Sequence, residues 1–377
     1  MHKIATKAVY KEAEILFRKG CNNIFYKNIM APEFDYKPFL NKINPYFAQW
    51  GFKFNMVEAE YFSLMSGVKS DIYITSTLFY HYLMPFLGVS NKYVDKNLFR
   101  KFLNEKAQNK KLDFRMPQQV IYNMNGIFYD GNDECITIDE AVDAVMAYHG
   151  DIISKPTYRT TWGKGVHKLE ADKKDKDKVR EMFANYKKDY SFEECVVQHN
   201  DMASLNKSSL NTTRIVTYRS PNGVIKYLLA FQRFGREGEV VDNASAGGNF
   251  LGVEDDGTLH RTIKQFKSLK TTPLSDNVVK KIPFFERMKE TAIYLHSKIP
   301  DLNYIGWDFT ISQDGQPIVI EFNNYASTDV SQITTGPAFS KEDLDELMPL
   351  VATRKPSYNC FPTVAFGDER GHGGRLR

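Results

Sequence analysis

The sequence predicts an α+β protein built from more than one domain. Two segments, 212–233 and 304–324, each hold paired runs of aromatic and β-branched residues around an Asn-Gly or Asp-Gly pair, the pattern of a β-hairpin. Between them, 281–299 has apolar residues at helical spacing and ends at a proline, which predicts an amphipathic helix. A chain of 377 residues is too long for one compact core, so we expect two or three domains.

The composition is that of a globular protein, with 42% hydrophobic and 25% charged residues. The net charge of +4 and the lack of a large Lys/Arg block argue against nucleic acid as a partner. The four cysteines have no CxxC spacing, which indicates free thiols in a reducing cytosol. The start of the chain does not resemble a signal peptide, and the uncharged stretch 72–89 contains His81 and Pro85. We therefore expect a cytoplasmic protein without an integral membrane segment.

The first elements in chain order are helical. Residues 1–92 have several segments with helical apolar spacing and no catalytic pattern, so this region is a candidate for shaping a substrate pocket. A helix should follow over 96–105, where Asp95 is a good N-cap residue and Asn97 lies in the first turn. The capping role accounts for Asp95 but leaves Lys96 without a structural explanation.

The next segment carries a pattern suited to phosphate. Residues 151–156 (DIISKP) read as a strand that ends in Lys155, and a loop over 157–166 (TYRTTWGKGV) follows. Backbone N–H groups of a glycine-bearing loop, here Gly163, Lys164 and Gly165, can approach phosphate oxygens, and lysines add charge. After a helix at 174–186, the run 195–199 reads as a strand that could present backbone groups and Gln198 to a purine edge.

The first hairpin brings two arginines to one face. If Asn222 and Gly223 form a two-residue turn, Thr212 pairs with Arg233, and Arg214 lies on the same side. Two guanidiniums on one face need an anion nearby, and either an oxyanion substrate or a structural salt bridge would serve. A polar, glycine-rich loop follows and contains Asn243.

The second hairpin brings together three oxygen-bearing side chains. With Asp314 and Gly315 as a two-residue turn, Asp308 lies opposite Glu321, and Asn323 shares their face. Two adjacent carboxylates repel unless a cation or a shared proton relieves them, and oxygen ligands suit Mg²⁺ or Mn²⁺. For the hairpin alone, a plain polar outer face is the other interpretation. The opposite face would pack through Ile318, Ile320 and Phe322.

The order of these motifs resembles the ATP-grasp superfamily, and within it the sugar-transfer-associated ATP-grasp proteins. The series runs DKN (95–97), Lys155, GKG (163–165), Gln198, NTTR (211–214), RFGR (233–236), DNASAGG (242–248) and the trio at 308, 321 and 323. The resemblance covers about two thirds of the chain. It implies two α+β subdomains that clasp ATP, at 93–200 with phosphate lid and hinge and at 201–351 with the metal site. The region 1–92 would precede them, and a tail over 352–377 would follow.

The resemblance also implies roles for individual residues. Two Mg²⁺ ions, which Mn²⁺ can replace, would bind Asp308, Glu321 and Asn323. The nucleotide would be held by residues of both subdomains, namely Lys96 and Lys155, the lid Gly163, Lys164 and Gly165, and the hinge residues Val197 and Gln198. Gln198 stands where many relatives carry a glutamate. Near the γ-phosphate and the acyl phosphate the matches are Arg233 and Asn243, with Arg214 as a further candidate.

The function implied is that of an ATP-dependent carboxylate–amine ligase that forms an amide through an acyl phosphate. Its partners would be a small carboxylate and an amine, such as a sugar acid or an amino acid, while the oligomeric state is left open. The subfamily points to surface-polysaccharide or peptide-like metabolite biosynthesis. Two alternatives remain, namely a phosphotransferase that acts on a sugar hydroxyl and a catalytically silent nucleotide-binding protein.

Overall fold

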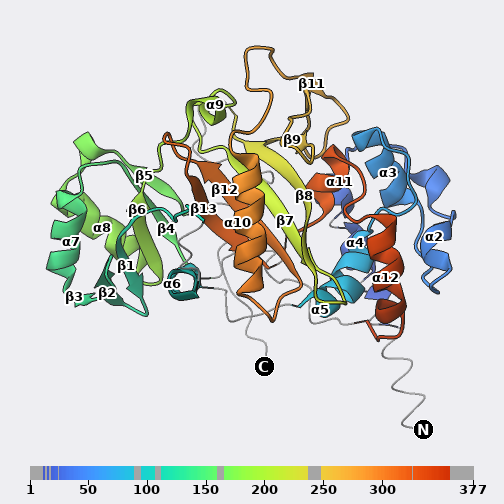
Figure 1. Ribbon diagram of the computed structural model, residues 1–377, viewed down its shortest axis with the longest axis horizontal. Coiled ribbons are helices and arrows are strands. Elements are labelled where there is room, and N and C mark those ends of the chain that lie inside the picture. Colours follow the sequence, from blue (N-terminus) through green and yellow to red (C-terminus); the bar gives the residue numbers. More distant parts are fainter. Residues whose placement is uncertain are drawn as a thin grey trace, which may run out of the picture.

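Two antiparallel sheets lie side by side, and a helical layer packs at the far end of the second sheet (Figure 1). The structure is a computed structural model that describes residues 12, 15–16, 18–23, 25–88, 95–106, 112–158, 165–236, 248–324 and 326–356. Within these ranges the two larger sheets have the strand orders β3-β2-β1-β6-β4-β5 and β13-β12-β7-β8-β9, and a third sheet has two strands, β10 and β11. This mixture of helices and antiparallel sheets confirms the predicted α+β class.

The six-stranded sheet and two helices form the first unit. Its strands are β1 (Gln119–Met124), β2 (Ile127–Asp130), β3 (Cys135–Ile136), β4 (Ile152–Pro156), β5 (His167–Leu169) and β6 (Tyr190–Glu194). The helices α7 (Ile138–Ala147) and α8 (Lys176–Tyr186) pack their apolar faces on the sheet, with Val142 and Val179 in one buried cluster with Phe192. Thr137 and Glu140 form a capping box that starts α7.

The five-stranded sheet carries a long helix on one face (Figure 1). Its strands are β7 (Thr212–Arg219), β8 (Ile225–Phe234), β9 (Asn249–Val253), β12 (Tyr304–Ile311) and β13 (Pro317–Asn323), and small elements beside it are α9 (Asn200–Ala203), β10 (Thr262–Ile263) and β11 (Thr272–Pro273). The helix is α10 (Phe285–Ser297), shorter than the predicted 281–299. It starts late because Phe284, with φ 55°, has left-handed backbone.

The other end of this sheet is covered by helices from both ends of the chain. They are η1 (Phe25–Ile29), η2 (Lys37–Phe39), α2 (Pro45–Ala48), α3 (Val57–Ser66), α4 (Ser76–Leu78), η3 (Phe79–Leu83), α5 (Met84–Leu87), α11 (Asp329–Thr334) and α12 (Lys341–Ala352). Phe62 of α3 and Tyr73, which lies between α3 and α4, share one buried cluster with Tyr218, Tyr304 and Leu347. The described part of the N-terminal region is mainly helical, as predicted.

Both predicted hairpins form with the expected partners, although both predicted turns are wrong. Asp308 pairs with Glu321, and Thr212 pairs with Arg233. Each turn has three residues rather than two, since Ser312 pairs with Gln316 and Ser220 with Val224 around Gly315 and Gly223. A three-residue turn shifts the register by one position, and a bulge farther along each hairpin shifts it back.

The bulge in β13 also changes which side chains face the core. The register shifts between Asp308 and Phe309, so that Ile320 is the extra residue of β13. Val319 and Phe322 consequently pack in the same cluster, and the predicted alternation of Ile318, Ile320 and Phe322 does not hold. A second correction concerns the strand expected at 195–199. The strand β6 ends at Glu194, and Gln198 makes only an isolated bridge to Ser312.

Candidate active site

The metal end of the predicted site lies on β12 and β13. Asp308 is almost fully buried, with a side chain that is 1% exposed, and faces Glu321 across the strands. The Nδ2 atom of Asn323 lies 3.3 Å from Oδ2 of Asp308 and 3.5 Å from Oε1 of Glu321. The structure therefore brings all three predicted metal ligands together on one hairpin.

Both arginines of the neighbouring hairpin contact Asp308. The Nη2 atoms of Arg214 and Arg233 each lie 2.9 Å from Oδ2 of Asp308, and Nε of Arg214 bonds the other carboxylate oxygen. Arg233 also donates to Oγ1 of Thr212, its cross-strand partner. The sequence leaves open whether these guanidiniums bind an oxyanion substrate or form a structural salt bridge. In the structure they form a salt bridge with the carboxylate of Asp308.

Lys96 is joined to the second carboxylate. It is the first residue of α6 (Lys96–Lys106), and Asp95 caps this helix by accepting from the backbone N–H of Asn97 at 2.8 Å, as predicted. The Nζ atom of Lys96 lies 2.8 Å from Oε2 of Glu321. Burial lowers the pKa of Lys96, but the charge and hydrogen bond of Glu321 together with the charges of Glu193 and Asp308 outweigh burial and raise the pKa overall. Lys96 therefore stays charged.

Lys155 is the second-last residue of β4, close to the predicted strand end, and pairs with a carboxylate that the sequence did not single out. Its Nζ lies 2.8 Å from Oε2 of Glu193, and Arg100 lies 3.1 Å from the other oxygen. Burial raises the pKa of Glu193, but the charges of Lys155 and Arg100 and the hydrogen bonds from Lys155 and Ser191 together outweigh burial and hold the pKa at about 2. Burial lowers the pKa of Lys155.

Glu193 and Arg100 are thus site residues that sequence reasoning missed. Glu193 lies two residues beyond Ser191, the cross-strand partner of Lys155, so both face the same side of the sheet. Two-residue alternation within 190–194 was the available signal. The predicted strand begins only at Cys195 and so leaves Glu193 out.

These side chains form one cluster with excess positive charge. Five cations and three carboxylates give an excess of two positive charges. The cations are Lys96, Arg100, Lys155, Arg214 and Arg233, and the carboxylates are Glu193, Asp308 and Glu321. The charge of Lys155 on the six-stranded sheet lowers the pKa of Glu321 on the five-stranded sheet. Charged residues of the two sheets therefore interact here. Such a cluster can accept a polyanion, and the two carboxylates with the amide of Asn323 fit the oxygen preference of Mg²⁺. No group of three or more His, Cys, Asp or Glu side chains suited to a metal occurs among the described residues.

The structure describes some of the remaining predicted site residues and not others. Gly163, Lys164 and Asn243 lie outside the described residues. Gly165 has φ 75°, and its carbonyl accepts a hydrogen bond of 2.6 Å from Tyr186. Val197 is 63% exposed. The side chain of Gln198 donates to the carbonyl of Ser209 and accepts from the backbone N–H of Asn211, so it holds the loop before β7.

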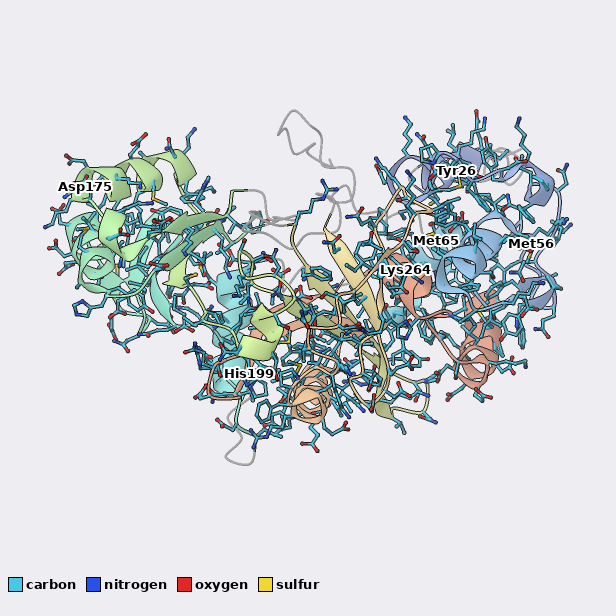
Figure 2. All side chains as sticks on the ribbon, turned by 90° about the horizontal axis from the view of Figure 1, so that it is seen from above. Tyr26, Met56, Met65, Asp175, His199 and Lys264 are labelled. Carbon is cyan, nitrogen blue, oxygen red and sulfur yellow. The ribbon has the colours of Figure 1, made fainter. Side chains whose placement is uncertain are left out.

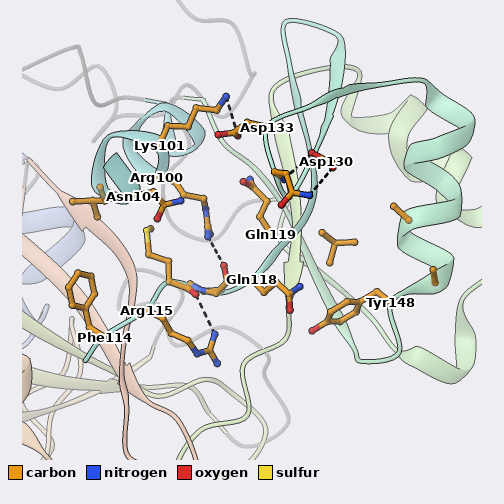
Figure 3. A pocket seen from close by; sticks show the side chains of 18 of the residues that line it. Arg100, Lys101, Asn104, Phe114, Arg115, Gln118, Gln119, Asp130, Asp133 and Tyr148 are labelled. Carbon is orange, nitrogen blue, oxygen red and sulfur yellow. Dashed lines mark hydrogen bonds and ion pairs between the residues drawn. The ribbon is translucent and has the colours of Figure 1, made fainter. Parts of the chain in front are cut away.

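A cavity of about 880 Å³ lies behind the cluster (Figure 3). It is lined by α6, the linker before β1 and the end of α7, and among its residues are Arg100, Arg115, Gln119 and Tyr148. Arg100 donates to the carbonyl of Pro117 at 2.5 Å on this side and pairs with Glu193 on the other. Because Asp308, Glu321 and Lys155 do not line it, we place the chemistry at the cluster and not in this cavity.

Comparison with known proteins supplies the family. No curated protein matches the chain. Three of the solved structures that match are all weakly similar. D-alanyl-alanine synthetase A from Vibrio cholerae has 12% identity and a TM-score of 0.41, covering 71% of this chain and 69% of that one. N5-carboxyaminoimidazole synthetase from Staphylococcus aureus, complexed with ADP, has 11% identity and a TM-score of 0.39, and the match covers 66% of this chain and 53% of that one. The ATP-grasp ligase PsnB, complexed with minimal precursor, has 15% identity and a TM-score of 0.37, and the match covers 69% of this chain and 60% of that one.

This chain thus spans about half of the Staphylococcus structure and somewhat more of PsnB. Within the described ranges, no helix has both the length and the apolar character that a membrane span requires. The model of one protein family, described as "Sugar-transfer associated ATP-grasp", matches residues 90–346, about two thirds of the sequence. The match includes both sheets and every residue of the charged cluster. The chain belongs to the sugar-transfer associated ATP-grasp family.

Proposed function

We propose that the protein is an ATP-dependent carboxylate–amine ligase that forms an amide through an acyl phosphate. The observation that carries this proposal is the charged cluster, in which an excess of cations surrounds a pair of carboxylates suited to Mg²⁺. A triphosphate with its metal complements that arrangement in charge. Family membership supports the use of ATP.

In this proposal Lys96 and Lys155 hold the phosphate oxygens, because each is a point charge on a rigid element. Glu193 holds Lys155 in place, and Arg100 in turn holds Glu193. Asp308, Glu321 and Asn323 would hold Mg²⁺, which would offset the charge on the phosphoryl oxygens. Because Lys96 already pairs with Glu321, a bound metal–nucleotide complex would take over part of that contact.

Arg233 is the proposed donor to the oxyanion that forms when the amine attacks the activated carboxyl. Its guanidinium is anchored on Thr212 and Asp308, and 16% of its side chain is exposed. Arg214 is more buried and bonds both oxygens of Asp308, so its proposed role is to orient that carboxylate. Four further proposals rest on the family pattern. Asn243 would lie near the γ-phosphate, and Gly163, Lys164 and Gly165 would form a lid. Val197 and Gln198 would form the adenine hinge, and two Mg²⁺ ions, which Mn²⁺ can replace, would bind.

Hydroxylamine trapping tests the ligase proposal. The protein is incubated with ATP, Mg²⁺ and a panel of sugar acids and amino acids, and ADP release and hydroxamate are measured. We expect hydroxamate to form with the carboxylate substrate, since hydroxylamine intercepts an acyl phosphate. ADP release with a phosphorylated sugar and no hydroxamate would instead establish a phosphotransferase. ATP binding by calorimetry without ADP release on any substrate would indicate a catalytically silent nucleotide-binding protein.

A matched pair of variants ties the activity to the cluster. In Glu321→Gln we expect kcat/KM for ADP release to fall at least about 100-fold, because a metal ligand and the partner of Lys96 are lost together. The control is Glu286→Gln, whose side chain on α10 is 68% exposed. Equal activity of both variants would show that Glu321 has no part in the reaction.

The family description also suggests a cellular setting. We propose that the protein acts in the cytoplasm on a sugar acid or amino acid during surface-polysaccharide or peptide-like metabolite biosynthesis. Support comes from the association with sugar transfer in the family description and from the need for ATP. Cell fractionation and comparison of surface polysaccharide between wild-type and deletion strains test both parts.

A further inference from the structure

The cavity of about 880 Å³ behind the charged cluster has walls of its own. They are α6, the linker 112–118 between α6 and β1, the turn between β2 and β3, and the end of α7. The cavity thus belongs to the side of the six-stranded sheet, and Figure 2 shows this side, marked by Asp175 before α8, at the opposite end of the molecule from Met65 of α3. Ligand pockets have volumes of about 300–1,000 Å³, so the cavity is large enough for a small molecule.

The cations of the cavity wall already have carboxylate partners. The pairs are Arg100 with Glu193, Lys101 with Asp133, and Arg115 with Glu194. The other acid of the wall, Asp130, accepts hydrogen bonds of 2.9 Å from the backbone N–H groups of Asn132 and Glu134. The wall therefore has no excess of positive charge, in contrast to the charged cluster. Because an anion would have to displace a carboxylate here, the charges favour an uncharged ligand.

Uncharged polar side chains supply the remaining hydrogen-bonding groups. They are Asn104 on α6, Gln118 in the linker and Tyr148 after α7, and their side chains form no hydrogen bond within the described part of the chain. Figure 3 shows Gln118 and Tyr148 pointing into the space between the linker and α7. Amides and phenols both donate and accept, as the hydroxyl groups of a sugar do. Phe114 and Met116 add apolar surface, which suits the C–H groups of a sugar ring.

Arg100 connects the cavity to one of the lysines proposed to hold phosphate. The residue is 7% exposed, and its Nη1 donates to the carbonyl of Pro117 in the cavity wall at 2.5 Å. Its Nη2 lies 3.1 Å from Oε1 of Glu193, whose other oxygen lies 2.8 Å from Nζ of Lys155. A single carboxylate therefore separates the cavity wall from Lys155.

Gln119 provides a second connection, to the segments that carry both lysines. Its Nε2 donates to Oδ1 of Asn97 at 2.9 Å, and Nδ2 of Asn97 donates to Oγ1 of Thr157 at 3.2 Å. Asn97 follows Lys96, and the backbone N–H of Lys96 donates to the carbonyl of Thr157 at 3.0 Å. Since Thr157 lies two residues after Lys155, a shift of Gln119 reaches the backbone beside both lysines.

The linker itself connects the cavity to the metal end of the site. The backbone N–H of Arg115 donates to the carbonyl of Pro317 at 3.1 Å, and its carbonyl accepts from the N–H of Val319 at 2.9 Å. Both partners lie on β13, the strand that carries Glu321. A molecule that fills the cavity would hold α6, the linker and α7 in this arrangement, and with them three groups of the charged cluster.

We propose that the cavity binds an uncharged sugar and that its occupancy tightens nucleotide binding at the charged cluster. The sugar is an effector and not the reacting substrate, because Lys155, Asp308 and Glu321 do not line the cavity. The coupling rests on the nucleotide site of the proposed ligase, whereas the sugar site does not. Coupling of this kind is reciprocal, so ATP should tighten sugar binding by the same factor.

The sugar site is tested first, without ATP. Free neutral sugars, namely glucose, galactose, mannose, rhamnose, N-acetylglucosamine and their disaccharides, are screened by saturation-transfer NMR, and calorimetry gives the Kd of each that binds. We expect saturable binding, lost in Ala147→Trp, which places an indole in the cavity. The matched control is Ala352→Trp, since each alanine is the exposed last residue of a helix.

Gln118→Ala removes one amide and should raise the Kd of the sugar about tenfold. The proposal would be overturned if no neutral sugar bound the wild type, or if Ala147→Trp bound the sugar as well as Ala352→Trp does.

The coupling is tested by calorimetry of ATP with Mg²⁺. With the sugar at saturation we expect the Kd for ATP to fall at least about fivefold in the wild type and in Ala352→Trp, and to stay unchanged in Ala147→Trp. The same Kd with and without sugar in the wild type would overturn the effector role. Sugar binding by a protein that binds no ATP would uphold the sugar site but overturn both the coupling and the proposed ligase.

Discussion

At the scale of single residues, the site depends on charges that neutralise one another while buried. Glu193 is the clearest case, because its side chain is 5% exposed and both of its oxygens have a cationic partner. A buried carboxylate of this kind adds little stability by itself, but its loss leaves Lys155 and Arg100 uncompensated. The residue therefore links stability to the position of the lysine proposed to hold phosphate.

We expect Glu193→Gln to destabilise the protein and to weaken nucleotide binding. The free energy of unfolding should fall by about 3 kcal/mol, because two buried cations lose their counter-charge. The Kd for ATP should rise about tenfold or more, since Lys155 is no longer held. Urea unfolding and calorimetry measure the two effects. Glu194→Gln is a useful control because Glu194 pairs with Arg115 and not with Lys155.

The same carboxylate should also give a recognisable pH dependence. Its pKa lies at about 2 in the folded protein and near 4.5 in the unfolded chain, so its contribution is complete above pH 4.5 and is lost as the pH falls toward 2. By pH 4 the free energy of unfolding of the wild type should have fallen by about 1 kcal/mol through protonation of this group. Glu193→Gln lacks the carboxylate and should show no such loss. The stability gap between the two proteins should therefore narrow between pH 7 and pH 4. A constant gap would contradict the assigned pairing.

At the scale of elements, the strand β12 packs closely against its surroundings where it carries Asp308. Gly306 lies between Tyr304 and Asp308, and a side chain there would meet the methyl group of Ala326 at 2.5 Å and the guanidinium of Arg214 at 3.1 Å. Glycine at this position lets the chain segment before α11 pack closely on the sheet. It also leaves room for Arg214 to reach Asp308.

Gly306→Ala is therefore expected to disturb the site through packing. The added methyl group should cost about 2 kcal/mol of stability, and it should lower kcat/KM about tenfold or more by displacing Arg214. The double variant Gly306→Ala/Ala326→Gly removes the opposing methyl group, so it should recover most of the stability. Thermal unfolding and ADP release follow both. Without recovery in the double variant, the contact with Ala326 would not be the cause.

At the scale of the whole molecule, the N-terminal helices and the five-stranded sheet share one hydrophobic core. Phe62 and Tyr73 pack in the same cluster as Tyr218 and Tyr304 of the sheet and Leu347 of α12. The proposed division at residue 92 therefore marks a change in role along the chain. In stability the two parts belong together, because each covers apolar surface of the other.

A chain that starts at residue 93 tests this dependence. Removal of the N-terminal helices would expose the aromatic face formed by Tyr218 and Tyr304, so we expect the fragment to aggregate or to unfold without a cooperative transition. Static light scattering and thermal unfolding of the fragment beside the full chain give the answer. A fragment with the Tm of the full chain would show that the helices are an independent domain.

The sequence by itself determined the fold class, the order of the motifs and the partners within each hairpin. These features are local, because strand alternation and the Asn-Gly and Asp-Gly pairs act over a few residues, which is why Asp308–Glu321 and Thr212–Arg233 were predicted correctly. The turn lengths were wrong, since the compensating bulges depend on how each strand packs against its neighbours.

Only the tertiary structure decided which charges meet. Lys96 joins Glu321 from another part of the chain, Arg214 and Arg233 converge on Asp308, and Glu193 pairs with Lys155 from a neighbouring strand. The helices α3 and α11, which come from opposite ends of the sequence, also pack together. Such contacts follow from packing between distant segments, and neither spacing nor composition encodes the distance between them.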